Sequence, residues 1–122
     1  MKKLFISCPM KGRTEENIRK TMDKMHKIAE DMFEQELEVI PSYIEDNPPE
    51  NTNAAVWYLG KSIQLLSEAD YYIGVDCLYF FNGCMVENEV AREYGIEYEL
   101  IRMNIAAPDV VEFESVSPKV CE

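Results

Sequence analysis

One stretch of the chain, residues 76–91, carries the acidic side chains best placed for catalysis. Asp76 follows a continuous apolar run at residues 71–75, and Glu87 lies four residues after Gly83. The apolar side chains at residues 78–81 would form a wall beside the carboxylate of Glu87. Burial raises the pKa of such a carboxyl, whereas the N-terminus of a helix lowers it. The segment therefore predicts a carboxylate at Glu87 that can act as a nucleophile. The alternative is structural, since acidic residues are favoured in the first turn of any helix.

A second candidate segment spans residues 7–13, with the sequence Ser-Cys-Pro-Met-Lys-Gly-Arg. It has neither the glycine spacing of a P-loop nor that of a dinucleotide-binding fingerprint. Its hydroxyl, its backbone amides and the cations Lys11 and Arg13 could hold a phosphate or a ribose near a helix N-terminus. The alternative is an ordinary strand-to-helix turn with solvated cations.

Cysteine and histidine point to no further chemistry. The four cysteines, at positions 8, 77, 84 and 121, contain no Cys-x-x-Cys pair, which argues against a zinc knuckle and a thioredoxin-like site. We expect neither a metal nor another cofactor. His26 lies at the margin of an apolar helical stripe and is interpreted as a packing or surface residue.

The elements that must position these segments alternate along the chain. Apolar runs at residues 4–7, 37–40, 71–75 and 98–101 predict strands, and amphipathic helices are predicted between them. Thr14 and Asn53 are the expected N-caps of the first two helices, and Gly95 is the expected left-handed cap after the third. This alternation predicts an α/β fold with a parallel sheet covered on both faces. Residues 103–122 are expected to be an irregular tail, unless residues 110–113 add an edge strand or contact another subunit.

Ligands of such sheets bind beyond the carboxyl ends of the strands. The segments expected at that edge are residues 7–13, 41–53, 76–87 and 102–104. The long loop contains Tyr43, and Trp57 and Tyr58 follow it. These aromatic rings could stack on a base, or they could pack in the core.

Length and charge restrict the partners. The 122 residues fit one domain, residues 1–122, and 23 Asp+Glu against 12 Lys+Arg give a net charge of −11. A phosphate backbone would repel this chain, so no nucleic-acid polymer is expected to bind, although a local pocket could still hold a small anion. The apolar runs fall short of the roughly 20 residues that cross a bilayer. Together with the absence of a disulfide pattern, this predicts a cytoplasmic protein without a membrane partner.

Three blocks of the sequence together resemble the nucleoside 2-deoxyribosyltransferase-like family, most closely its small bacterial and phage members. The blocks are Phe5-Ile6-Ser7-Cys8-Pro9-Met10-Lys11-Gly12, Ala69-Asp70-Tyr71-Tyr72-Ile73 and Gly83-Cys84-Met85-Val86-Glu87-Asn88-Glu89-Val90-Ala91. They stand in the family's order and cover most of the chain. The resemblance implies a flavodoxin-like three-layer fold with four or five parallel strands. It also implies N-glycosidic bond cleavage, or deoxyribosyl transfer, on a (deoxy)nucleoside or nucleoside 5′-monophosphate.

The resemblance also implies roles for single residues. Glu87 would attack the anomeric carbon, and water or a second base would then resolve the glycosyl-enzyme with retention. The expected substrate-binding residues are Ser7, Cys8, Pro9, Met10, Gly12, Arg13, Tyr43, Ser62, Asn82 and Gly83. Because family members usually complete their pockets across a subunit interface, we also expect a homo-oligomer.

Two positions depart from the family pattern. Cys8 stands where active members usually have glycine, and Ser62 stands where they often have an acidic residue. Asp76 is therefore the candidate for a second catalytic carboxylate. The alternative function is a non-catalytic protein of the same fold that binds a nucleotide or a nucleotide-derived signal.

Overall fold

The computed structural model describes residues 1–10, 12–42, 44–76, 82–107 and 110–116, with side chains up to residue 102. The elements follow in the order β1 (Lys2–Ile6), α1 (Glu15–Phe33), β2 (Leu37–Val39), α2 (Ala54–Leu66), β3 (Tyr71–Val75), α3 (Asn82–Glu93), β4 (Glu97–Ala107) and β5 (Val110–Val116).

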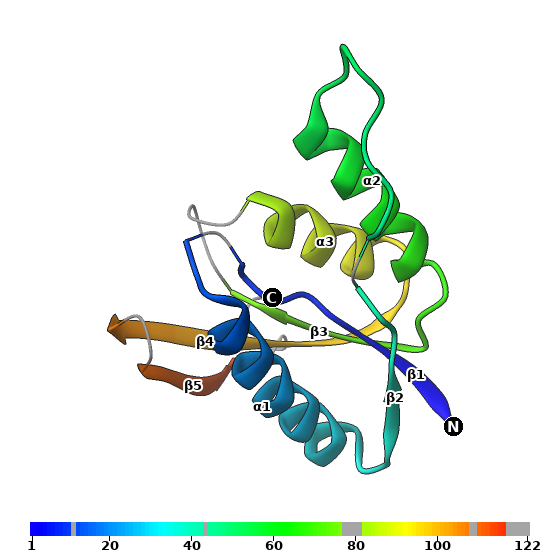
Figure 1. The fold of residues 1–122 in the computed structure, drawn as a ribbon. Helices are drawn as coiled ribbons and strands as arrows, with labels where there is room; N and C mark the ends of the chain where they lie inside the picture. Colours follow the sequence, from blue (N-terminus) through cyan, green and yellow to red (C-terminus); the bar gives the residue numbers. More distant parts are fainter. Residues whose placement is uncertain (11, 43, 77–81, 108–109, 117–122) are drawn as a thin grey trace.

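The strands form one sheet with the order β2-β1-β3-β4-β5 (Figure 1). The first four strands are parallel, and β5 pairs antiparallel with β4. Since the chain moves from β1 outward to β2 and then returns to β3, the strand order reverses between β1 and β3. The predicted α/β fold, with a parallel sheet in a flavodoxin-like three-layer arrangement, is confirmed.

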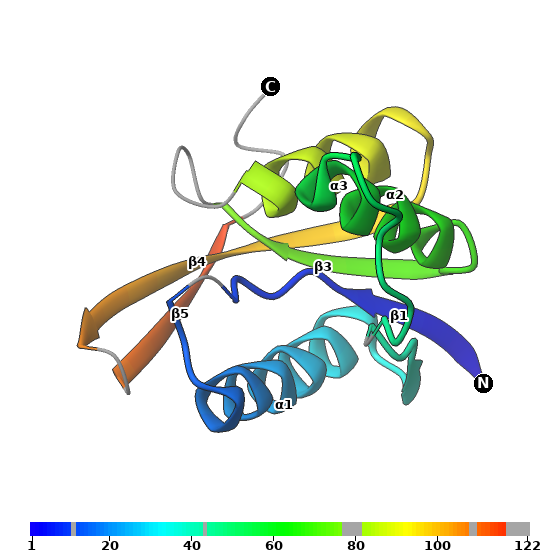
Figure 2. The same cartoon turned by 45° about the horizontal axis from the view of Figure 1, so that its top comes forward.

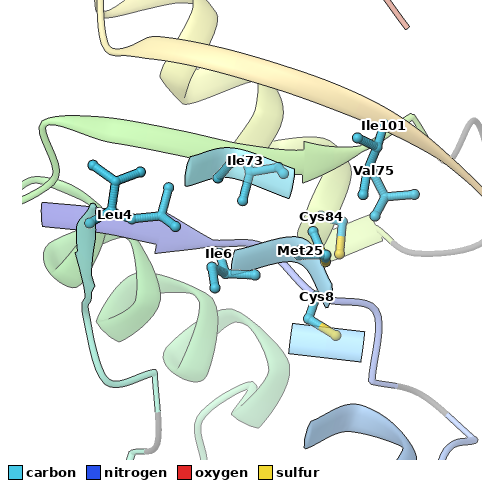
Figure 3. Close-up of a cluster of buried hydrophobic side chains, with 10 residues drawn as sticks. Leu4, Ile6, Cys8, Met25, Ile73, Val75, Cys84 and Ile101 are labelled. Atoms are coloured by element: carbon cyan, nitrogen blue, oxygen red, sulfur yellow. The ribbon is translucent and has the colours of Figure 1, made fainter. Parts of the chain in front are cut away.

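Helices cover both faces of the sheet, with α1 on one side and α2 and α3 on the other (Figure 2). Side chains of a strand alternate between faces, so successive residues of β1 enter different cores. Leu4 and Ile6 belong to the cluster on the α1 side, shown in Figure 3 with Met25. Phe5 packs on the opposite side with a cluster that includes Leu66.

The predicted caps determine where two helices begin. The Thr14 hydroxyl accepts the Asn17 N–H at 3.2 Å, and the Asn53 side-chain oxygen accepts the Val56 N–H at 3.1 Å. Each cap satisfies a backbone donor that the helix itself leaves unpaired. Gly95, after α3, has the expected positive φ of 75°.

The C-terminal region differs from the irregular tail that was expected. β4 continues to Ala107, and residues 110–116 form β5, so the edge-strand alternative is the correct one. These distal strand segments extend past the helical layers (Figure 1), where they pair antiparallel with each other. Such pairing needs no continuous apolar pattern, which explains why the sequence signal was weak.

None of the helices in the described ranges combines the length and apolarity that a bilayer span requires.

Candidate functional site

A cleft of about 1280 Å³ opens at the carboxyl end of β1, the strand beside the reversal in strand order. The loop after β1, one face of α1, the middle of α2 and the start of α3 line it. The sequence-predicted residues that it brings together are Ser7, Cys8, Pro9, Met10, Arg13, Ser62, Asn82, Gly83 and Glu87. This is the edge at which the order of strands and helices predicted a site.

Glu87 is the buried acidic side chain of this cleft. It is only 8% exposed, and its two carboxylate oxygens accept hydrogen bonds from different elements. The Ser7 hydroxyl donates to Oε1 at 2.7 Å, and the Ser62 hydroxyl of α2 donates to Oε2. Both oxygens of the carboxylate are thereby fixed in orientation.

Burial raises the pKa of Glu87, and the hydroxyls of Ser62 and Ser7 oppose that rise. The sequence predicted that a helix N-terminus would oppose burial instead. However, α3 begins at Asn82, earlier than the sequence indicated, so Glu87 falls in its second turn rather than its first. The helix dipole acts mainly within the first turn. The effect that opposes burial therefore comes from two side-chain donors, and not from the helix dipole as predicted.

Asn88, the neighbour of Glu87, anchors α3 to β3. Its side-chain N–H₂ donates to the Val75 carbonyl at 2.8 Å, and its oxygen accepts from the Tyr72 hydroxyl. A Cβ at Gly74 would overlap the Asn88 oxygen and lie 2.7 Å from the Tyr72 hydroxyl, so the close approach requires glycine. Sequence analysis missed this anchor, although a glycine inside a buried strand was the available signal.

Ser7 is held as firmly as the carboxylate that it binds. It directly follows β1, is 1% exposed, and its backbone N–H donates to the Ile73 carbonyl of β3 at 2.9 Å. The hydroxyl is thus carried by the central part of the sheet rather than by a long loop.

Arg13 ties the loop after β1 to α1. Its guanidinium donates to the Pro9 carbonyl at 2.8 Å, to the Asn17 carbonyl at 3.3 Å, and to the Thr21 hydroxyl. These hydrogen bonds hold the loop after β1 against α1. The sequence predicted a phosphate contact for Arg13 and did not predict this structural role. Lys11, the other predicted cation, lies outside the described residues.

Cys8 is buried beside Arg13. Burial raises the pKa of its thiol to about 11, although the nearby guanidinium acts in the opposite direction. Near neutral pH the side chain is therefore a thiol, which behaves as a small apolar group.

Other predicted site residues are not brought into this arrangement. Asp76 is half-buried and its backbone N–H donates to the Ile101 carbonyl, but it is not among the described residues that line the cleft. Gly12 is exposed with a φ of 75°, and it is likewise not part of that lining. Tyr43 lies outside the described residues, and so do residues 77–81, which include the predicted apolar wall at residues 78–81.

His26 packs α1 against β2, as expected. Its Nε2 lies 2.9 Å from the Leu37 carbonyl and 3.3 Å from a carboxylate oxygen of Glu30. The sequence did not predict that His26 would also line the α1 side of the cleft.

One of the predicted aromatic residues lines the cleft. Tyr58 does so from α2 and is 37% exposed. Trp57 packs edge-on against it with ring centroids 5.2 Å apart, and the Lys61 ammonium lies 5.3 Å from the centroid of the Trp57 ring. Tyr58 is therefore available to a ligand, while Trp57 supports it from behind.

Within the described ranges, no three His, Cys, Asp or Glu side chains gather as metal ligands would. No protein-family model matches the chain, and no curated protein matches it significantly.

Proposed function

We propose that the protein cleaves the N-glycosidic bond of a (deoxy)nucleoside or nucleoside 5′-monophosphate, or transfers its deoxyribosyl group, with Glu87 as the nucleophile. The observation that carries this proposal is the buried Glu87 carboxylate, held at both oxygens by Ser7 and Ser62 inside the cleft. A fixed, partly desolvated carboxylate is suited to attack an electron-poor carbon.

In the proposed reaction, a carboxylate oxygen of Glu87 forms a bond to the anomeric carbon. The bond from that carbon to the base nitrogen breaks, and its electron pair leaves with the base, which takes a proton from water. Water or a second base then attacks the same carbon, gives up a proton that neutralises the hydroxide from the first step, and releases the carboxylate. Two displacements at one carbon give overall retention.

The cleft offers contrasting surroundings for the two parts of such a substrate. Tyr58, Leu59 and Ile44 supply aromatic and apolar surface that suits a base. Ser7 and Asn82 supply polar groups on the side where Glu87 lies. If the sugar binds beside Glu87, the base of the substrate would therefore lie against Tyr58 and Leu59 of α2.

The test is incubation with a panel of nucleosides and 5′-monophosphates, followed by chromatography of the free base. The wild-type protein should release base, and Glu87→Gln should lower the rate by several powers of ten, because loss of a nucleophile removes the covalent route. Glu89→Gln is the matched control: Glu89 is exposed on the same helix and pairs with Arg92. Equal turnover in Glu87→Gln and Glu89→Gln would refute the mechanism.

A non-catalytic binding protein is the second candidate. It is favoured because Ser62 provides no second acid and Asp76 is not among the described lining residues. Equilibrium binding of the same panel, measured together with base release, separates the two functions. Micromolar binding without released base would favour the binding protein.

A further inference from the structure

The hydrogen bond between Ser62 and Glu87 joins two helices inside the cleft. Ser62 lies 25 positions before Glu87, in the middle of α2, and its hydroxyl donates to Oε2. Beyond it along α2, Leu66 is buried, whereas residues 54–56 at the start of the helix are exposed. The hydroxyl thus lies where α2 passes from the cleft into the core.

We propose that Ser62 is a positioning residue for Glu87: its hydroxyl selects the ionised carboxylate and fixes the orientation of Oε2. The proposal rests on the proposed function, because it assigns Ser62 a role in preparing the nucleophile rather than in binding substrate.

The chemistry of the contact supports this role. A hydroxyl bonds more strongly to a carboxylate than to a neutral carboxyl, because the acceptor is charged. Burial works against the charge of Glu87 and raises its pKa, and the hydroxyls of Ser62 and Ser7 oppose that rise. Removing the Ser62 hydroxyl should therefore raise the pKa of Glu87 further.

Among the side chains that the structure describes, no full charge of opposite sign stabilises the Glu87 carboxylate. Within the described side chains, Glu87 has no ion-pair partner, and the Arg13 guanidinium is turned to Pro9, Asn17 and Thr21. The titratable and charged residues that line the cleft with Glu87 are Cys8 and Arg13 before α1, Glu15, Arg19, Asp23 and His26 on α1, Tyr58 on α2, and Cys84 on α3. The two serine hydroxyls remain as the groups that hold the carboxylate.

The experiment compares the full-length wild type with Ser62→Ala, Ser62→Thr and Ser67→Ala. Alanine is the best helix former, so Ser62→Ala should fold. Threonine keeps the hydroxyl. Ser67 is the control, because it caps the same helix, is exposed, and its hydroxyl donates to the Gln64 carbonyl outside the cleft.

The first readout is a carbon-13 NMR pH titration of the Glu87 carboxyl, whose signal is assigned by its loss in Glu87→Gln. In Ser62→Ala the midpoint should move to higher pH, with the ionisation constant about tenfold smaller, as expected for one lost hydrogen bond to a charged group. Ser62→Thr should restore the wild-type midpoint, and Ser67→Ala should not change it.

The second readout is the pH dependence of base release. The acidic limb of kcat should move to higher pH in Ser62→Ala, while KM changes little. An unchanged NMR midpoint in folded Ser62→Ala would overturn the proposal, and so would a Ser62→Thr variant that fails to restore it. If the midpoint moves as expected but wild type releases no base, Ser62 still orients the Glu87 carboxylate, and the assignment of that carboxylate as a nucleophile falls with the catalytic function.

Discussion

At the scale of single residues, burial of the Glu87 carboxylate in the cleft destabilises the folded state. A carboxylate removed from water loses hydration that two hydroxyl donors replace only in part. The pKa of Glu87 is accordingly raised by burial, despite Ser62 and Ser7. In the unfolded chain the pKa of Glu87 is not raised in this way. Ionisation of Glu87 therefore favours unfolding.

This imbalance predicts a pH-dependent gain in stability for Glu87→Gln. A raised folded-state pKa means that the stabilising form is the protonated one, present below the unfolded pKa and lost as pH rises through the folded pKa. Gln mimics that neutral form. At pH 7 to 8, differential scanning calorimetry should therefore give Glu87→Gln a higher Tm than wild type.

The difference should shrink as pH falls toward 4.5, the ordinary pKa of a glutamate carboxyl, where wild type is itself protonated. Glu89→Gln is again the control, since Glu89 is exposed and its own pKa is lowered, chiefly by a hydrogen bond from Arg92. A Tm of Glu87→Gln that is below wild type at neutral pH would contradict the prediction.

Glu87 could be singled out from sequence because an acid shortly after a glycine and a buried strand must lie at the carboxyl edge of a parallel sheet. Its partners were only named as possible substrate-binding residues. Ser7 is 80 positions away and Ser62 is 25 positions away on a different helix. These contacts depend on how α3 packs against the end of β1 and against α2, which local patterns do not determine.

At the scale of elements, the packing of α3 against β3 determines the position of Glu87. Asn88 spans the gap between helix and strand, with its oxygen over Gly74 and its N–H₂ on the Val75 carbonyl. Helix α3 can approach this closely because β3 has no side chain at position 74. The sequence predicted both elements correctly, but not the polar anchor between them.

Gly74→Ala should therefore damage stability and site together. The new methyl would overlap the Asn88 oxygen and press on the buried Tyr72, which cannot swing into solvent. Overpacking of this kind costs about 1–3 kcal/mol, measurable by urea unfolding. Displacement of α3 should also lower base release more than the stability loss alone explains at temperatures where the variant is folded.

Gly60→Ala provides the matched control. Gly60 lies in α2, and a Cβ there would meet nothing within 4 Å. Since alanine is the better helix former, this change should stabilise the protein by about 0.5–1 kcal/mol. Equal effects of the two substitutions would show that the contact between Gly74 and Asn88 does not control the seat of α3.

At the scale of the whole molecule, the parallel sheet was predictable because each strand is a compact apolar run and each helix has a cap and a stripe. Thr14 and Asn53 begin their helices as predicted. β5 was harder to predict, since residues 110–116 mix apolar and acidic residues without a continuous apolar run, and the strand pairs antiparallel with β4. The position of the cleft then follows from the strand order, which reverses between β1 and β3.

Several large apolar side chains on the outer helices bear on the expected self-association. Val56 and Tyr58 on α2, and Met85 and Val86 on α3, are exposed by 62%, 37%, 38% and 41%. Single exposed apolar side chains are ordinary, but several on the helices that line the cleft favour burial by a second copy. We therefore expect a homodimer whose contact includes these helices.

The net charge of −11 makes this expectation sharper. Two such chains repel each other, and salt screens that repulsion over a Debye length of about 10 Å at 0.1 M, whereas an apolar contact persists. In sedimentation velocity at micromolar concentration, a species of about twice 14.1 kDa should therefore become more abundant as sodium chloride is raised. Val86→Gln should weaken the dimer without changing the charge. Tyr94→Gln, at an 80% exposed position beyond the end of α3, should not. A single 14.1 kDa species at every salt concentration would mean that each chain completes its cleft alone.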